Sequence, residues 1–383
     1  MTKKLYIKTF GCQMNVYDSA RIQAALKMQG YEPTDTPEEA DIMLLNTCHI
    51  REKAAEKLYS EIGRLNNIKQ IRKQHGHKTL LIVAGCVVQA VGEELLIRSH
   101  AVDIAVGPQM YHKLPELVAR FNRKKGRVIE TDFPADSKFD YLPMHDAKGP
   151  TAFLAIQEGC DNFCSYCVVP YTRGVETSRP IDDVIREAKI LVDGGTLEIN
   201  LLGQNVNSYH GEDANGKERN LAYLLNRLNE IDGLKRIRYT TSYPADVNDE
   251  LIDCHKNIEK LMPYLHLPIQ SGSDSILKAM NRRHNSSQYL DIIERLREAN
   301  PNLGFSSDFI VGFPGETDAD FQATLDVVDK VKYIQAFSFK YSRRPGTPAS
   351  IMPNQVEEKV KKERLAILQE KLFDYQHKFT DDT

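Results

Sequence analysis

The sequence has no long hydrophobic run and no excess of charge of one sign. Its longest apolar stretches, such as residues 80–84 and 309–313, are far shorter than the ~20 residues that a transmembrane helix needs. The N-terminus shows no apolar signal region followed by a small-residue cleavage site. Fifty basic residues balance 53 acidic ones, which leaves a net charge of −3 and no global signal for nucleic-acid binding. We therefore expect a cytoplasmic protein that does not enter a membrane.

The sequence is also poor in cysteine, with 7 among 383 residues. In a cytosolic chain of this size, cysteines point to a metal site or reactive thiols rather than to a disulfide framework.

Residues 1–130 alternate between strand-like and helix-like segments. Strands are expected at residues 5–10, 41–46, 79–84 and 102–106, and helices at 18–28, 52–65, 93–98 and 111–121. Such alternation predicts a parallel sheet covered by helices on both faces, that is, a small doubly wound α/β domain. Residues 131–150 contain three prolines and no sustained period, which predicts a linker.

Residues 151–350 contain a second α/β series. Strands are expected at residues 152–157, 197–202, 236–241, 264–269, 304–311 and 333–341, and helices at 181–192, 221–231, 247–254, 287–299 and 319–331. Six such units suggest a full or partial (β/α)6 barrel, although the pattern alone does not separate a barrel from a doubly wound sheet. Residues 351–383 contain a final helix at 356–379, whose many Lys and Glu residues indicate a solvated surface.

Three cysteines, Cys160, Cys164 and Cys167, follow the first strand of this second series in a C-x3-C-x2-C spacing. The carboxyl end of a barrel strand is where α/β barrels build active sites. Thiolates favour iron–sulfur clusters, which normally take four cysteines, so three leave one iron open to an outside ligand. The alternatives are a zinc site completed by His210 or His266, or three unrelated thiols.

Three further cysteines, Cys12, Cys48 and Cys86, each follow a predicted strand of the first series. The carboxyl ends of neighbouring parallel strands lie side by side, so these thiols are expected to meet at one edge of the sheet. Gly11 and Gly85 would let the backbone approach closely there. The alternative is three buried structural thiols, which is a common role for cysteine.

The loop containing Cys160, Cys164 and Cys167 resembles that of the radical S-adenosylmethionine (SAM) enzymes. The resemblance implies that the open iron binds the amino and carboxylate groups of SAM, and that the reduced cluster cleaves SAM to a 5′-deoxyadenosyl radical. Tyr166 occupies the aromatic position of that motif, which implies a contact near the adenine of SAM; local packing is the alternative.

Further segments are similar to those of one radical SAM family, the methylthiotransferases. They are residues 11–15 (GCQMN), 46–52, 85–86, 160–174, 200–206, 265–273 and 307–317. The resemblance spans nearly the whole chain. It implies two 4Fe-4S clusters, with an auxiliary cluster on Cys12, Cys48 and Cys86 and a SAM-binding cluster on Cys160, Cys164 and Cys167.

Within this family, GCQMN is typical of the tRNA-modifying MiaB branch, whereas the RimO branch, which acts on a ribosomal-protein aspartate, usually has GCPKN. A third tRNA-modifying branch usually has GCKVN. The resemblance implies methylthiolation at C2 of N6-isopentenyladenosine at position 37 of tRNA, with one SAM as methyl donor and one as radical source. It also implies an electron donor such as flavodoxin or ferredoxin, a sulfur source, and a monomer. The alternatives are methylthiolation of a ribosomal-protein aspartate, or a non-catalytic iron–sulfur or zinc module that binds RNA.

Two departures from the family are expected. His49 stands where serine is frequent and could contact the auxiliary cluster. The family ends in a small RNA-binding TRAM domain, and this sequence stops just after the helix that leads into it, so we expect that domain to be absent.

Polar residues near the barrel strand ends are the candidates for SAM contacts. Gln204 and Asn205 follow the second strand, Ser242 the third and Gln270 the fourth, while Asp308 lies within the fifth. Each could equally cap a helix or a turn. Gly312 and Gly315 would loosen the loop that passes the adenine.

Four further residues belong neither to the cysteine triads nor to the candidate SAM contacts. Arg173 and Arg343 are candidates for pairing with phosphate or carboxylate, with a surface ion pair as the alternative. Cys254 is expected to be structural. His284, beside two arginines, could touch RNA phosphate, although a solvated loop is the simpler expectation.

Overall fold

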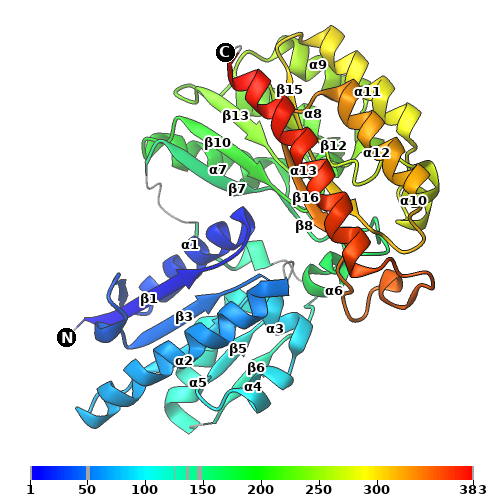
Figure 1. Ribbon diagram of the computed structural model, residues 1–383. Coiled ribbons are helices and arrows are strands. Elements are labelled where there is room, and N and C mark those ends of the chain that lie inside the picture. The colour runs from blue at the N-terminus through cyan, green and yellow to red at the C-terminus, as the bar shows by residue number, and fades with distance from the viewer. Residues whose placement is uncertain (1, 49–51, 125, 135–137, 145–148, 382–383) are drawn as a thin grey trace. The chain divides into compact units, whose positions relative to one another are not determined.

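The structure is a computed structural model that describes residues 2–48, 52–124, 126–134, 138–144 and 149–381 (Figure 1). It divides into two compact units. The first contains Met1–Ala147 and Val169–Thr177, and the second contains Lys148–Val168 and Ser178–Thr383. Among the described residues, no helix is both long and apolar enough to span a bilayer.

The first unit contains a six-stranded parallel sheet in the order β2-β1-β3-β4-β5-β6. Its strands are β1 (Lys3–Thr9), β2 (Tyr31–Pro33), β3 (Ile42–Asn46), β4 (Leu80–Ala84), β5 (Ile104–Val106) and β6 (Val128–Glu130). The sequence predicted four of the six. The two edge strands, β2 and β6, have three residues each and are too short to show a period.

Helices cover both faces of this sheet, which confirms the doubly wound fold. They are α1 (Gln13–Lys27), α2 (Glu52–Gln74), α3 (Cys86–Val91), α4 (Glu94–Arg98) and α5 (Leu114–Lys124), with 3-10 turns η1 (Pro37–Glu39), η2 (Pro108–Lys113) and η3 (Lys138–Asp140). Helices α1 and α5 share one buried core with Leu44, whereas α2, α3 and α4 share the other with its neighbour Leu45. Alternate residues of β3 therefore point to opposite cores, as a strand's period of two requires.

The strand order reverses between β1 and β3. The chain leaves β1 for β2 on one side and then crosses back to β3 on the other. Open α/β sheets bind ligands outside the carboxyl ends of the strands at such a switch point. Cys12 and Cys48 follow the two strands that flank it.

Part of the expected linker packs into the first unit. Leu142 belongs to the core shared by α1 and α5, and Lys138 is 1% exposed. Lys138 Nζ lies 3.1 Å from Asp18 Oδ1, and Arg21 Nη2 donates to the Leu142 carbonyl oxygen at 2.9 Å. These contacts join residues more than 100 positions apart, so no local sequence pattern predicts them.

The second unit contains two three-stranded parallel sheets in the orders β7-β10-β13 and β14-β15-β16. The strands are β7 (Thr151–Ala155), β10 (Glu198–Leu202), β13 (Arg236–Tyr239), β14 (Tyr264–His266), β15 (Gly304–Val311) and β16 (Gln335–Lys340). A parallel bridge between Ile237 and Leu261 connects the two sheets. The six strands and their intervening helices form a partial (β/α)6 barrel, as expected.

The expected helices of the second unit are present, with shorter elements between them. The helices are α7 (Ile181–Asp193), α8 (Leu221–Asn229), α9 (Asp249–Asn257), α11 (Ser286–Ala299) and α12 (Asp318–Val331). The elements that the sequence did not predict are α6 (Val169–Arg173), α10 (Asp274–Ala279), β8 (Gln157–Glu158), β9 (Thr177–Ser178), β11 (His210–Glu212), β12 (Glu218–Asn220), η4 (Val206–Ser208), η5 (Pro244–Asp246) and η6 (Pro348–Ile351).

Strands β10 and β13 carry an apolar pair and charged residues on opposite faces. Paired residues of neighbouring parallel strands share a face, and Ile199 and Ile237 form one such buried pair. The adjacent positions along these strands carry charge: Arg238 Nε donates to Glu198 Oε1 at 3.1 Å.

Helix α13 (Glu358–Asp381) ends the chain and packs against α12, β15 and β16. Leu368 and Leu372 are buried. Arg364 Nη1 donates to Glu316 Oε1 at 2.8 Å, and this carboxylate oxygen also accepts from the Gly312 backbone N–H at 2.8 Å. One face of the helix is therefore part of the barrel fold, while its other residues form the expected solvated surface.

Candidate functional site

The first unit brings Cys12 and Cys48 into contact at the switch point. A hydrogen bond with the Cys48 thiol lowers the pKa of Cys12 to about 6, and the charge of Arg173 adds to this effect. Cys86 is buried, and burial raises the pKa of its thiol despite the nearby Arg173. Cys12 and Cys86, two of the three thiols expected to meet, are therefore both influenced by the charge of Arg173.

The two predicted glycines lie close to the cysteine segments. A Cβ added at Gly11 would stand 2.4 Å from Cys48 Cβ, and one added at Gly85 would stand 2.2 Å from the Thr47 carbonyl oxygen. Both have positive φ angles, 115° and 107°, which L-residues rarely adopt. The close approach predicted at these positions is confirmed.

A buried polar network surrounds Cys12. Asn15 Nδ2 donates to the Phe10 carbonyl oxygen at 2.8 Å, and Cys12 Sγ lies 3.8 Å from Asn15 Oδ1. Arg173 Nη2 donates to Asn15 Oδ1 at 3.1 Å and to Asp18 Oδ2 at 2.9 Å. The ion pair of Arg173 is therefore buried, not the surface pair weighed from the sequence.

The second triad lies on the loop after β8. The Cys167 N–H donates to the Cys164 carbonyl oxygen at 2.9 Å, which closes a tight turn between two of the cysteines. Asn162 Nδ2 lies 3.5 Å from Cys160 Sγ. Phe163 has a φ of 45°, an unusual conformation for a bulky residue and one that recurs at functional loops.

Tyr166 lies between this loop and the barrel. Its ring meets Phe313 edge-on, with centroids 6.5 Å apart. Burial raises the pKa of its phenol well above the usual range, and the neighbouring Cys164 adds to this effect. Tyr166 is therefore a neutral, half-buried residue beside a cysteine.

One of the candidate SAM contacts is connected to the cysteine loop. Gln204 Oε1 accepts from the Gly159 backbone N–H at 2.6 Å, next to Cys160. Asn205 Nδ2 instead donates to Asp246 Oδ2 at 2.7 Å, outside that loop. Gln204 thus supports the cysteine loop, and the roles of both residues as ligands or caps stay predictions.

Several buried polar atoms of the second unit have no hydrogen-bond partner within the described part of the chain. They include Asn200 Oδ1, Asn205 Oδ1, Ser242 Oγ and Arg282 Nε. Buried polar groups are nearly always hydrogen-bonded, so each of these atoms is a candidate for a contact with a polar ligand. SAM, which carries an amine, a carboxylate and ribose hydroxyls, is such a ligand.

Gln270 follows β14 and forms an isolated parallel bridge with Phe309 of β15, the neighbour of Asp308. Gln270 has a φ of 77°, and its backbone N–H donates to the Asp308 carbonyl oxygen at 3.0 Å. The Asp308 carboxylate points instead to His266, whose Nε2 lies 3.7 Å from Asp308 Oδ1. Gly312 and Gly315 have φ angles of 70° and 85°, so the following loop does use backbone that favours glycine.

Both triads suit an iron–sulfur cluster by the chemistry of their thiol donors. Each cysteine of such a cluster binds a different iron, so its sulfurs need not converge on one point. Among the described residues, no group of three or more His, Cys, Asp or Glu side chains has the geometry of a single-ion site. The histidines considered for zinc have other partners: His266 Nδ1 lies 2.7 Å from Ser306 Oγ, and His210 Nδ1 lies 3.0 Å from the Ser208 carbonyl oxygen.

Sequence reasoning missed Arg282, whose Nη1 lies 3.7 Å from Cys164 Sγ. The two arginines were noted only as neighbours of His284, the possible phosphate contact, and nothing local ties them to a loop about 120 residues earlier. The solvated loop expected around His284 is wrong: its side chain is 5% exposed, and burial lowers its pKa to about 3. Arg343 is exposed. Cys254 is buried, as expected for a structural cysteine. His49 lies outside the described residues.

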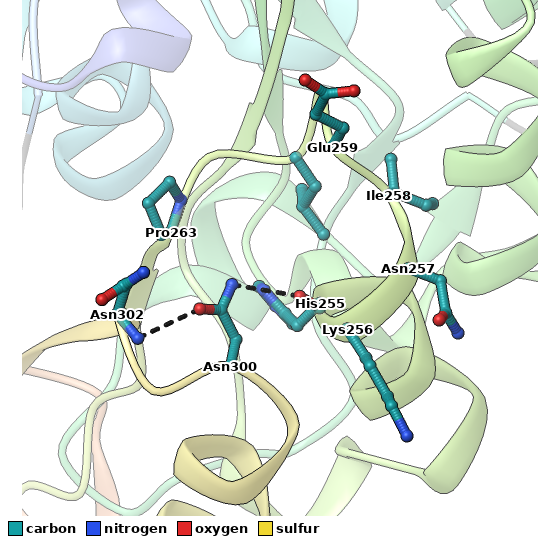
Figure 2. A pocket seen from close by; sticks show the side chains of 9 residues that line it. His255, Lys256, Asn257, Ile258, Glu259, Pro263, Asn300 and Asn302 are labelled. Atoms are coloured by element: carbon teal, nitrogen blue, oxygen red, sulfur yellow. Dashed lines mark hydrogen bonds between the residues drawn. The ribbon is translucent and has the colours of Figure 1, made fainter.

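A pocket lies at the opposite ends of the barrel strands (Figure 2). Its lining comes from the loops that enter β14 and β15, including His255, Glu259, Asn300 and Asn302. Asn300 Nδ2 donates to the His255 carbonyl oxygen at 3.1 Å, as Figure 2 shows. Features at this end of a barrel usually serve stability, and these contacts tie two loops together.

Two family patterns match the chain. Residues 4–107 match the family described as uncharacterized protein family UPF0004, and residues 154–328 match the radical SAM superfamily. Among solved structures, the radical SAM methyltransferase TsrM from Kitasatospora setae, with cobalamin and a [4Fe-4S] cluster bound, has a TM-score of 0.67 at 14% identity. The likeness covers 92% of this chain and 77% of that one. At this identity it supports the fold alone.

Two curated relatives are much more similar. The tRNA-2-methylthio-N(6)-dimethylallyladenosine synthase of Agrobacterium fabrum is 56% identical over 385 residues, covering 99% of this chain and 84% of the relative. The protein of the same name from Bartonella bacilliformis is 55% identical over 384 residues, covering 99% and 83%. The chain therefore belongs to the family of radical SAM tRNA-2-methylthio-N(6)-dimethylallyladenosine synthases.

Proposed function

We propose that this protein converts N6-isopentenyladenosine at position 37 of tRNA to its 2-methylthio derivative, using one SAM as methyl donor and one as radical source. The name of the relatives at 55–56% identity gives the product, 2-methylthio-N(6)-dimethylallyladenosine in tRNA. The observation in this chain that carries the proposal is the presence of two separate cysteine sites. Gly11, packed against Cys48, marks the first site, and the loop from Cys160 to Cys167 forms the second.

We assign the auxiliary cluster to Cys12, Cys48 and Cys86 in a domain of residues 1–130, and the SAM-binding cluster to Cys160, Cys164 and Cys167 in a barrel of residues 151–350. When bound, the two 4Fe-4S clusters and SAM supply the sulfur-transfer and radical chemistry, because protein side chains alone do not activate such a C–H bond.

The side chains position these groups. Gln204 holds the backbone beside Cys160. The unpartnered polar atoms of Asn205 and Ser242, together with Gln270, Asp308 and the ring of Tyr166, are our candidates for contacts to SAM. Residues 131–150 would connect the domains, and residues 351–383 would complete the barrel through α13.

The experiment that tests this proposal is mass spectrometry of tRNA nucleosides. A bacterial strain that lacks its own methylthiotransferase would express the chain, a Cys12→Ala variant or a Cys164→Ala variant. The unsubstituted chain should restore the 2-methylthio nucleoside, and each variant should leave only N6-isopentenyladenosine. Unmodified nucleosides with the unsubstituted chain would contradict the proposal.

The alternatives give different results in the same cells. Methylthiolation of a ribosomal-protein aspartate would appear in the mass of that protein. A non-catalytic module would bind one cluster or zinc and produce neither product. Iron, sulfide and zinc measured in anaerobically reconstituted protein separate these outcomes, since our proposal requires two clusters per chain.

We propose further that the protein works in the cytoplasm as a monomer. It would receive electrons from a flavodoxin or ferredoxin and sulfur from a separate source. Size-exclusion chromatography with light scattering, and a reduction assay with each electron carrier, test these points.

A further inference from the structure

One segment of the barrel that holds the loop of the second triad is residues 279–283, which begins at the last residue of α10. Ser165 N–H donates to the Met280 carbonyl oxygen at 3.0 Å, and Ser165 Oγ donates to the Ala279 carbonyl oxygen at 2.8 Å. Asn281 Nδ2 donates to the carbonyl oxygens of Asn162 and Phe163 at 3.1 and 3.0 Å. The contacts with Asn281 fix the carbonyl groups before and after the Phe163 Cα atom. They therefore hold Phe163 in its unusual φ.

Of the residues in this segment, only Arg282 has a side-chain atom near a sulfur atom of the triad. Its Nη1 lies 3.7 Å from Cys164 Sγ, and its Nη2 donates to the Pro268 carbonyl oxygen at 2.5 Å. The next residue, Arg283, points elsewhere: its Nη2 donates to Asn162 Oδ1 at 2.7 Å and to Asp246 Oδ1 at 2.9 Å.

The guanidinium of Arg282 is held in place from a third side. It lies 4.1 Å from the centroid of the Tyr243 ring, in a cation–π contact. The Tyr243 backbone is fixed in turn by Asn207, whose Oδ1 accepts from the Tyr243 N–H at 2.7 Å. The planar guanidinium of Arg282 thus contacts a carbonyl oxygen, an aromatic ring and a sulfur, and it has little freedom to turn away from Cys164.

A fixed cation beside a ligating sulfur has a defined electrostatic consequence. A cluster gains one negative charge when it is reduced, and a nearby positive charge favours the reduced state. Hydrogen bonds to the sulfurs are among the known determinants of iron–sulfur reduction potentials. The effect is strong where the surroundings exclude water.

We propose that Arg282 is a positioning residue that donates a hydrogen bond to the Cys164 thiolate and thereby raises the reduction potential of the cluster bound at Cys160, Cys164 and Cys167. This inference rests on the proposed function only in taking that triad as a cluster site. Its role is separate from that of Arg283, which orients Asn162 without touching sulfur.

The test uses the full chain with Cys12, Cys48 and Cys86 replaced by Ala, so that a single cluster is titrated. Arg282→Gln and the matched control Arg283→Gln are introduced into this background and reconstituted anaerobically. Iron and sulfide are counted, and the midpoint potential is followed by electron paramagnetic resonance. We expect Arg282→Gln to lower the equilibrium constant for one-electron reduction about tenfold, a shift of about 59 mV to more negative potential. Arg283→Gln should change it less than about threefold, because Arg283 donates to no sulfur itself and only supports Asn162, whose Nδ2 lies 3.5 Å from Cys160 Sγ.

Equal shifts in the two variants, or no shift in Arg282→Gln, would overturn the inference. If Arg282→Gln holds no cluster, Arg282→Lys replaces it, since lysine keeps the charge but cannot reach Cys164 and Pro268 at once. The potential of that variant should lie below that of the background protein. If both variants fold and neither binds a cluster, Arg282 is needed for assembly and the proposal about potential is wrong.

The measurement requires neither tRNA nor SAM, so it is independent of the methylthiolation assay. A shift in potential without the modified nucleoside would reject the proposed function and leave this inference standing. A background protein that binds no cluster at all would overturn both.

Discussion

Gly11 lies so close to Cys48 that a Cβ on the glycine would stand 2.4 Å from the cysteine Cβ. Two segments more than 30 residues apart therefore meet with no room for a side chain between them. The contact brings the ends of β1 and β3 together at the point where the sheet reverses its strand order. The Gly11–Cys48 contact and three other buried features of the structure each lead to one testable prediction.

Replacement of Gly11 by Ala should disrupt the first cysteine site. The added Cβ would collide with Cys48 and would also require a φ of 115°. Iron content measured in a background without Cys160, Cys164 and Cys167 should fall from one cluster towards none. Gly30→Ala is the matched control, because Gly30 has a φ of 82° but no atom within 4 Å of the added Cβ. That control should cost only about 1–2 kcal/mol of backbone strain. Equal iron loss in both variants would mean that strain, not space, is decisive.

Removal of Arg364 should destabilise the barrel strongly. Its Nη1 pairs with Glu316, whose side chain is 2% exposed, so Arg364→Ala would strand a buried carboxylate. We expect a loss of about 3–5 kcal/mol in the free energy of unfolding, measured by urea titration. The control is Lys371→Ala. Lys371 lies on the same helix as Arg364, and its ion pair with Asp329 of α12 is more exposed, so its loss should cost less than about 1 kcal/mol. A similar small loss for both would show that α13 contributes little to the fold.

Stability should fall as the pH drops from about 6.5 towards 4. Burial lowers the pKa of His255 from 6.5 to about 4, so the folded protein binds fewer protons than the unfolded chain in this range. The stabilisation from neutral His255 is present above the unfolded value and is lost as the pH falls through the folded one. At about 1.4 kcal/mol per pKa unit, the full loss is on the order of 3 kcal/mol.

Urea titrations at several pH values would measure this slope in the unsubstituted protein and in His255→Asn, where it should be smaller. Exposed His77→Asn is the control and should leave the slope unchanged. A slope that is the same in all three proteins would contradict the assignment to His255.

Ser242→Ala should weaken SAM binding without destabilising the ligand-free protein. The Ser242 hydroxyl is buried and makes no hydrogen bond within the described residues, so its removal deletes no protein contact. A hydrogen bond is worth about 1 kcal/mol net, so we expect roughly fivefold weaker binding of SAM by anaerobic calorimetry.

Ser307→Ala is the comparison for this experiment. Ser307 Oγ accepts from the Ile269 N–H at 3.0 Å, and its loss should lower stability rather than affinity. If Ser242→Ala lowered the melting temperature as much as Ser307→Ala, the Ser242 hydroxyl would be structural instead.

Much of the architecture was predictable from local pattern. The strand over residues 304–311 was predicted with its observed bounds, because it contains Phe305 and the apolar residues 309–311 and has a glycine at its start and another just after its end. The three-residue strands β2 and β6 were missed because they are too short for any period to appear. Helix α2 was predicted to end at residue 65 but continues to Gln74. The prediction was too short because the last turns are polar and lack an apolar stripe.

The cysteines were located from the sequence because each follows a strand, and the ends of neighbouring parallel strands meet. Covalent order and side-chain periodicity are local properties, and they determined the parallel sheets and the positions of Cys12, Cys48 and Cys86 after strands, with glycines beside two of them. The ligand roles of both cysteine triads stay predictions. Only the tertiary structure decided which distant side chains reach the sites, such as Arg173 beside Asp18 and Arg282 beside Cys164. These pairs join positions more than 100 residues apart, and a long flexible side chain carries no sequence signal of the partner that it meets.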